Sequence, residues 1–190
     1  FSYGKKLAFT HVPAMLEMAG IPYTGSSPLG HTLALDKVIT KILAIEAGVP
    51  TPAFAVLSGP GRSEGPSSGD LSKMRYPMVV KPRHESSSFG LRMVENRAEL
   101  DAAVAFVAEH YQQEALVEEY IAGREVAVGI IGNGPGTCLP LVEIDFAGRH
   151  LAMMTHADKV HKSEQEPLRI CPAPVDAGLA LLADVLGRPD

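Results

Sequence analysis

The sequence has no tryptophan, only two cysteines, no long apolar run and no cluster of basic residues. A helix that crosses a bilayer needs about 18 or more consecutive apolar residues, so no membrane span is predicted. The net charge is −5, and without grouped lysines and arginines to neutralise phosphates the chain is not expected to bind nucleic acid. The first residues lack the apolar core of a signal peptide.

The few cysteines and histidines do not form a recognisable metal site. Cys138 and Cys171 lie far apart and belong to no C-x-x-C pair, so neither a zinc site nor a disulfide framework is indicated. His84, His156 and His161 complete no ligand set, so no metal site is predicted within this chain. Two free thiols suit a reducing compartment, and we expect a cytoplasmic protein.

What the sequence does contain is typical of a folded chain. Of its 190 residues, 46% are hydrophobic and 21% are charged, enough to form one domain with a substantial core or two small ones. Helical and strand periodicities occur in mixed order without strict alternation, which favours an α+β fold over a doubly wound sheet.

Individual elements follow from this periodicity and from turn signals. Helices are predicted at 11–19, 32–47, 96–110 and 176–186. Strands are predicted at 21–25, 53–57, 78–81, 115–120, 125–131 and 139–146, with the last three as an antiparallel meander. Residues 58–72 are rich in Gly, Pro and Ser and are expected to form a surface loop. Residues 148–174 show little periodicity, which is typical of a functional lid.

The segment from Lys81 to Gly90 is the most informative for chemistry. An apolar strand ends in Lys81, and a hydroxyl-rich loop closed by Gly90 follows. A compact ammonium followed by loop N–H and hydroxyl donors suits the oxygens of a polyphosphate. Taken alone, however, a lysine at a strand end followed by a polar turn is the more frequent explanation of such a pattern.

Five short motifs supply the missing context. They are GIPYTGS at 20–26, LALDK at 33–37, GVPTP at 48–52, VVKP at 79–82 and LVEEYIAGRE at 116–125. In this order, over nearly the whole chain, they resemble the D-alanine–D-alanine ligase family of ATP-grasp enzymes. The resemblance implies an ATP-grasp fold in which the nucleotide lies between two α+β subdomains. It divides the chain into the end of an N-terminal substrate domain (1–30), a central subdomain (31–122) and part of a C-terminal subdomain (123–190).

The resemblance also implies a set of ATP-binding residues, although it assigns no catalytic residue. Lys37 and Lys81 match two lysines that bind the phosphates, and Glu85, Ser86, Ser87 and Ser88 match a loop that covers them. Glu118, Glu119, Tyr120 and Ile121 match the hinge, where the backbone of Glu119 and Ile121 reads the adenine edge. Glu125 matches the acid that holds the ribose hydroxyls, and Lys159 matches a lysine of a mobile loop that closes on the phosphates.

Each of these positions has a simpler explanation. Lys37 and Lys41 are four residues apart, which suits a solvated helix face. Glu118 and Glu119 suit ordinary charges at a strand end. Glu125 alternates with Val126 and Val128, as a solvent-facing strand residue does.

The activity that the resemblance implies is ATP-dependent joining of two amino acids through an acyl phosphate, in peptidoglycan biosynthesis. ATP and Mg²⁺ are the implied cofactors, small amino acids the substrates, and a homodimer is left open. The family's later Arg-x-Asp and Glu-x-Asn motifs, which carry the transition-state arginine and the magnesium ligands, have no counterpart before Asp190. We therefore expect the metal ligands outside this chain, and this chain alone to be inactive.

Two positions depart from the family pattern. Ser86 stands where the family usually has glycine, and Val160 stands where the D-alanine–D-alanine ligases usually have an aromatic residue. These departures leave two alternatives open: a ligase for another amino acid or peptide, and an ATP-binding module without catalytic activity.

Overall fold

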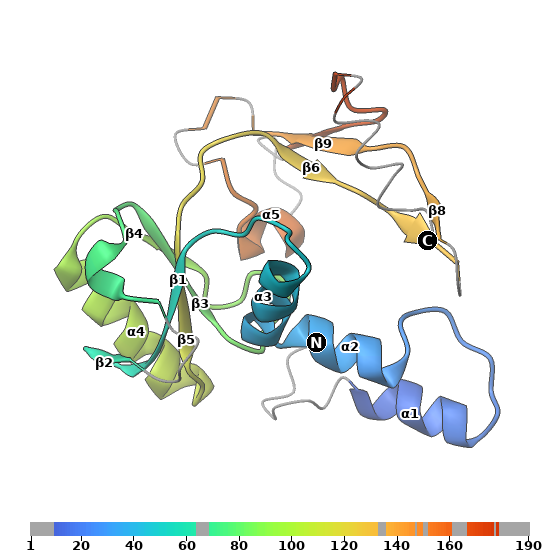
Figure 1. The fold of residues 1–190 in the computed structure, drawn as a ribbon, viewed down its shortest axis with the longest axis horizontal. Helices are drawn as coiled ribbons and strands as arrows, with labels where there is room; N and C mark the ends of the chain where they lie inside the picture. Colours follow the sequence, from blue (N-terminus) through green and yellow to red (C-terminus); the bar gives the residue numbers. More distant parts are fainter. Residues whose placement is uncertain are drawn as a thin grey trace. The chain divides into compact units, whose positions relative to one another are not determined.

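A computed structural model of the protein describes residues 10–63, 69–132, 136–146, 148–149, 152–160, 167–176 and 178. The chain forms two compact units, Phe1–Ile121 and Ala122–Asp190. Both units combine strands with helices, which confirms the α+β prediction (Figure 1). In the part of the chain that is described, no helix has the length and apolar character that crossing a membrane requires.

The first unit is built on a five-stranded antiparallel sheet in the order β2-β1-β5-β3-β4. Its strands are β1 (Phe54–Gly59), β2 (Arg62–Ser63), β3 (Met78–Pro82), β4 (Arg92–Val94) and β5 (Ala115–Glu119). The strands predicted at 53–57, 78–81 and 115–120 are confirmed. The sequence pattern missed β4, because only three residues pair there and just one of them, Val94, is fully buried.

One face of this sheet is covered by helix α4 (Arg97–Tyr111), as Figure 1 shows. Alternate strand residues such as Ala55 and Leu57 face this helix and pack with its Val104 and Val107. Asn96 caps the helix by accepting a hydrogen bond from the Glu99 N–H at 3.0 Å, so the helix predicted at 96–110 is confirmed together with its cap.

The opposite face of the sheet packs against α3 (Lys37–Glu46), where Val38 joins a cluster with Phe54, Val56 and Leu116. The prediction of a single helix at 32–47 is wrong, because the chain forms two helices, α2 (Pro28–Leu35) and α3. They are separated at Asp36, whose extended backbone ends α2 and whose side chain caps α3. Asp36 Oδ1 accepts from the Val38 N–H at 3.0 Å and the Ile39 N–H at 3.2 Å.

Near the N-terminus, α1 (His11–Met18) confirms the helix predicted at 11–19. The strand predicted at 21–25 is wrong, because the segment is an irregular turn with no pairing partner. Pro22 in the middle of this segment has no N–H to donate to a neighbouring strand.

The second unit contains a three-stranded sheet in the order β10-β9-β6 and a two-stranded ribbon of β7 and β8. The strands are β6 (Glu125–Ala127), β7 (Ile130–Ile131), β8 (Thr137–Cys138), β9 (Val142–Asp145) and β10 (Leu168–Ile170). The predicted meander is wrong, because β5 pairs with β1 and β3 of the first unit, and the strand expected at 125–131 is divided between two sheets.

The segment 148–174, predicted to be irregular, contains β10 and a short helix α5 (His156–Val160). Residues 150–151 and 161–166 of this segment lie outside the described residues, as does most of the helix predicted at 176–186.

Candidate functional site

A cluster of lysines lies on the sheet face that α3 covers. Strand alternation directs Val80 and Val117 towards α4, and therefore directs Lys81 and Glu118 to the other face. Lys41, from α3, places its Nζ 2.7 Å from Glu118 Oε1, while Lys81 Nζ pairs with Glu118 Oε2. Two lysines from different elements thus share one carboxylate.

Lys41 is buried, with only 7% of its side chain exposed. Its Nζ also donates to Thr51 Oγ1 at 2.6 Å and lies 4.9 Å from the centre of the Phe54 ring. The alternative of a solvated lysine face is therefore wrong for Lys41. The alternative of an ordinary strand-end charge is wrong for Glu118, which is also buried. Burial opposes the charge of Glu118, but Lys81 and Lys41 outweigh it and hold the pKa of this carboxyl below its usual value.

Lys37 begins α3 and donates its ammonium protons to the backbone oxygens of Arg83, at 3.2 Å, and of Glu85. Burial, followed by the positive charge of Lys81, lowers the pKa of Lys37 to about 8. A partly buried ammonium that is bonded to carbonyls and repelled by a second ammonium is stabilised when an anion binds beside it. The structure thus brings together the two lysines predicted to bind phosphate.

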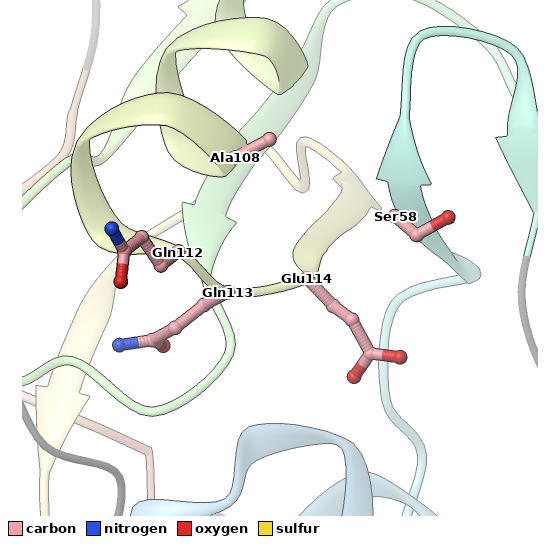
Figure 2. Close-up of a pocket in the computed structure, with 5 residues that line it drawn as sticks. All are labelled: Ser58, Ala108, Gln112, Gln113 and Glu114. Atoms are coloured by element: carbon pink, nitrogen blue, oxygen red, sulfur yellow. The ribbon is translucent and has the colours of Figure 1, made fainter.

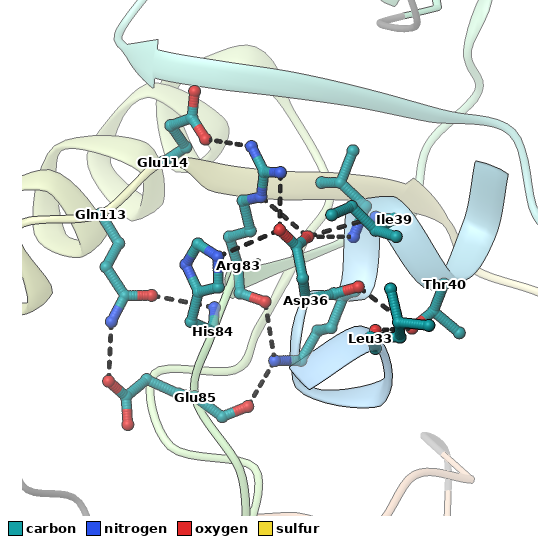
Figure 3. Close-up of polar contacts among 11 residues, drawn as sticks. Leu33, Asp36, Ile39, Thr40, Arg83, His84, Glu85, Gln113 and Glu114 are labelled. Atoms are coloured by element: carbon teal, nitrogen blue, oxygen red, sulfur yellow. Dashed lines mark hydrogen bonds and ion pairs between the residues drawn. The ribbon is translucent and has the colours of Figure 1, made fainter. Parts of the chain in front are cut away.

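An ion-pair network fixes the start of α3 to the chain that leaves β3 (Figure 3). Arg83 binds Asp36 with both arms of its guanidinium, Nε to Oδ1 at 2.8 Å and Nη2 to Oδ2 at 2.7 Å. Its Nη1 binds Glu114 Oε2 at 2.6 Å, and His84 Nε2 lies 3.2 Å from Asp36 Oδ2. Asp36 is adjacent to Lys37 and Arg83 follows Lys81 by two residues, so this network joins the two segments that carry the lysines.

The predicted phosphate loop is anchored at its start. Gln113 accepts from the His84 N–H at 2.9 Å and donates to Glu85 Oε1 at 2.8 Å (Figure 3). Glu85 is buried and points towards Gln113, so its side chain supports the loop from within. Ser87 and Ser88 have left-handed backbones, with φ of 53° and 58°, but Ser86 does not. A side chain at position 86, where the family usually has glycine, therefore carries no backbone strain.

Gly90 closes this loop and packs tightly against neighbouring side chains. Its φ is +68°, and a Cβ there would lie 2.7 Å from both Pro82 Cγ and Tyr111 Cε2. We expect Gly90→Ala to destabilise the protein by about 1–3 kcal/mol, because the backbone strain adds to the overpacking. Urea denaturation followed by circular dichroism measures this loss.

Gly20→Ala is the matched control for Gly90→Ala. Gly20 has nearly the same φ, +66°, but no atom within 4 Å of the added Cβ. It therefore isolates the cost of the left-handed backbone, and equal losses in the two variants would contradict the tight contact at Gly90.

At the predicted hinge, part of the backbone is already engaged. The Glu119 N–H donates to Ala53 O at 3.0 Å, and the Tyr120 N–H donates to Pro77 O at 3.1 Å. The Glu119 side chain accepts from the Arg75 N–H at 2.9 Å. If this segment reads an adenine edge, the candidate groups are therefore the Glu119 carbonyl and the N–H of the exposed Ile121.

A polar cavity of about 210 Å³ lies elsewhere on this unit, lined by Ser58, Ala108, Gln112, Gln113 and Glu114 (Figure 2). Gln113 and Glu114 also belong to the network around Arg83, but none of the clustered lysines lines this cavity. Its position and lining therefore do not match the predicted nucleotide site.

The remaining predicted residues belong to the second unit. Glu125 is exposed on β6, and Lys159 is exposed on α5. Their roles towards the ribose and the phosphates stay predictions. Among the described residues of both units, no group of three or more His, Cys, Asp or Glu side chains could hold a metal ion.

Comparison with known proteins identifies the family of this chain. Residues 43–179 match the family model described as the D-ala D-ala ligase C-terminus. The chain is 49% identical over 178 residues to an uncharacterized protein, y4sG, of Sinorhizobium fredii, covering 93% of this chain and 51% of that protein. It is 38% identical over 138 residues to the D-alanine–D-alanine ligase of Bordetella pertussis, covering 70% and 41%.

Solved structures give the same result. The D-alanine–D-alanine ligase from Bacillus anthracis complexed with ATP matches with a TM-score of 0.67 and 26% identity, over 93% of this chain and 52% of that chain. The VanG D-Ala:D-Ser ligase from Enterococcus faecalis matches with a TM-score of 0.66 and 25% identity, over 93% and 50%. The chain thus spans about half the length of the relatives it matches. It has the ATP-grasp fold and belongs to the D-alanine–D-alanine ligase family, of which it matches the C-terminal domain.

Proposed function

We propose that this chain supplies nucleotide contacts to an ATP-dependent carboxylate–amine ligase that joins two amino acids, as the D-alanine–D-alanine ligases do. The observation that carries the proposal is the environment of the Lys37 ammonium group. Its ammonium is partly buried, bonded to backbone carbonyls and close enough to Lys81 for the two charges to repel. Glu118 is the carboxylate partner of Lys81, and it is shared with Lys41. A polyphosphate would supply further negative charge beside these ammonium groups.

In the proposed reaction, a substrate carboxylate attacks the γ-phosphorus of ATP, the bond to ADP breaks, and an acyl phosphate forms. An amine then attacks the acyl carbon, and inorganic phosphate leaves. Lys37 and Lys81 neutralise the phosphate oxygens in this scheme, and the loop of Ser86, Ser87 and Ser88 donates hydrogen bonds to them. These residues act by positioning and by stabilising charge rather than by forming a covalent bond.

The rest of the nucleotide is assigned to the other predicted positions. The Glu119 carbonyl and the Ile121 N–H take the adenine edge, Glu125 the ribose hydroxyls, and Lys159 the phosphates. Magnesium is the metal that the family resemblance implies. Among the described residues, no group of three or more His, Cys, Asp or Glu side chains fits such an ion, and the proposed roles of the lysines and the loop do not depend on it.

Proton uptake on ATP binding tests the protonation state of Lys37. At pH 8, about half of the free chain lacks the Lys37 proton, because the folded pKa is about 8. Phosphate groups favour the charged form, so we expect ATP binding near pH 8 to take up a substantial fraction of a proton. Calorimetry in two buffers with different ionisation enthalpies measures this uptake.

Lys37→Arg is the control, since arginine keeps its proton at this pH and should show no uptake. Equal proton uptake in both proteins would contradict the assignment of Lys37.

The lowered pKa of Lys37 also affects stability in the absence of nucleotide. Between pH 8 and the usual lysine pKa of 10.5, the unfolded chain binds more protons than the folded chain. The contribution of Lys37 to the free energy of unfolding therefore becomes more favourable as pH rises through that window.

The ligase activity itself is tested on a protein that is as long as the full-length members of the family. We expect phosphate release that requires ATP and an amino acid, with D-alanine favoured in a panel of D- and L-amino acids. A preference for another amino acid or a peptide would fit Val160, which replaces the usual aromatic residue. ATP binding without phosphate release under any condition would favour the non-catalytic alternative. A preference for D-alanine in this panel would support the expected role in making peptidoglycan precursors, which we propose takes place in the cytoplasm.

A further inference from the structure

The carboxylate of Glu118 is shared between two lysines, with one ammonium at each oxygen. Lys41 holds Oε1 at 2.7 Å and Lys81 holds Oε2. The two lysines differ in their surroundings. Lys41 is 7% exposed and fixed by Thr51 and Phe54, whereas Lys81 is 25% exposed. Only Lys41 is therefore held from several sides by the fold.

A charge count shows why two lysines matter. One carboxylate neutralises one ammonium, so the group of Lys41, Lys81 and Glu118 has a net charge of +1. If Lys81 were the single partner of Glu118, the pair would be neutral. Moving Lys81 towards a ligand would then leave a buried carboxylate without a counter-charge, which is strongly unfavourable.

We propose, on the basis of the function proposed above, that Lys41 is a positioning residue for ATP binding. It is the permanent counter-ion of Glu118, and it thereby leaves the charge of Lys81 available to the phosphates. No predicted contact with the nucleotide involves Lys41, so its effect on affinity passes through Glu118 and Lys81.

Removing this counter-ion is expected to weaken ATP binding. In Lys41→Met, Glu118 keeps Lys81 as its remaining ammonium, and the phosphates must compete with a buried carboxylate for that lysine. We expect ATP affinity to fall by roughly tenfold, comparable to losing one hydrogen bond to a charged group. Calorimetric titration of the chain with ATP measures the change.

A second substitution is expected to restore binding. In Lys41→Met/Glu118→Gln the competing carboxylate is gone, so Lys81 is free to bind phosphate again. We expect the double variant to bind ATP more tightly than Lys41→Met does, although it carries one more substitution in the site, which is strong non-additivity. A purely structural role for Lys41 predicts instead that ATP affinity changes only in step with the thermal stability of each variant.

Two controls accompany the affinity measurements. Thermal melting shows whether the variants fold, and the double variant is expected to do so because neutral side chains of similar volume often replace a buried ion pair without loss. Lys73→Met is the matched surface control. Lys73 is 83% exposed, and its Nζ lies 3.6 Å from Asp70, so ATP affinity should not change.

The possible failures are distinct from one another. If the unmodified chain does not bind ATP, the proposed function fails. If the chain binds ATP and Lys81→Met weakens binding, but Lys41→Met binds as tightly as the original chain, the role of Lys41 is refuted. A folded double variant that binds ATP no better than Lys41→Met also overturns the proposal.

Discussion

Replacing Lys81 with alanine is expected to reduce ATP affinity by about ten- to a hundredfold, since hydrogen bonds to charged groups contribute about 1.5–3 kcal/mol each. The fold should survive, because Glu118 keeps its bond to Lys41 and no buried carboxylate is left without a counter-charge. Calorimetry with ATP measures the affinity, and thermal melting checks the fold.

Lys73→Ala provides the control for this prediction, because its ion pair with Asp70 is on the surface. We expect ATP affinity in this variant to equal that of the original chain. Unchanged affinity in a folded Lys81→Ala variant would refute the assignment of Lys81 to the phosphates.

Asp36→Ala is expected to have the largest effect on stability, a loss of about 3 kcal/mol. The substitution removes the cap of α3 together with both bonds to the Arg83 guanidinium. Arg83 keeps Glu114 as a partner. The expected loss is therefore at the lower end of the free-energy cost of breaking a buried ion pair. Urea denaturation followed by circular dichroism measures the free energy of unfolding.

Asp70→Ala is a matched comparison for Asp36→Ala. Asp70 also caps a helical turn, through the Ser72 N–H at 3.0 Å, but it is exposed and its nearby lysine is on the surface. We expect a much smaller loss in this variant. Similar losses in the two variants would show that the Asp36–Arg83 pair contributes little.

The acid sensitivity of Asp36 follows from the same contacts. Burial raises its pKa, but the Arg83 hydrogen bonds and backbone donors outweigh burial and lower the pKa from 3.8. The stabilisation from this group is therefore present above about pH 4 and is lost as pH falls through the folded pKa.

Local sequence patterns predicted much of the first unit correctly. The strands carrying Lys81 and Glu118 are apolar runs with clear ends, and α4 has both a cap and an apolar stripe, so these elements were identified. The break at Asp36 was missed because the apolar periodicity continues across it. The signal was present, since an aspartate before a helical run is a common cap.

Long-range partners could not be predicted in the same way. The sequence pattern placed Lys37 and Lys41 on one helix face, but it did not show that this face lies against the sheet. Strand pairing is needed to show that Glu118 faces α3. The folded arrangement is likewise needed to show that Arg83 reaches Asp36 across 47 residues of sequence. The predicted meander failed for the same reason, because β5 pairs with distant strands rather than with those that follow it.

The most direct test of the central claim, that the lysine cluster of the first unit binds the phosphates of ATP, is a titration of isotopically labelled chain with ATP followed by NMR. We expect the largest shifts at Lys37, at Lys81 and in the loop 86–88, with smaller shifts at the hinge 118–121. The exposed Lys73 and the cavity residue Ser58 should show little change. Shifts centred on the cavity of Ser58 and Gln112, with the lysine cluster unaffected, would contradict the proposed site.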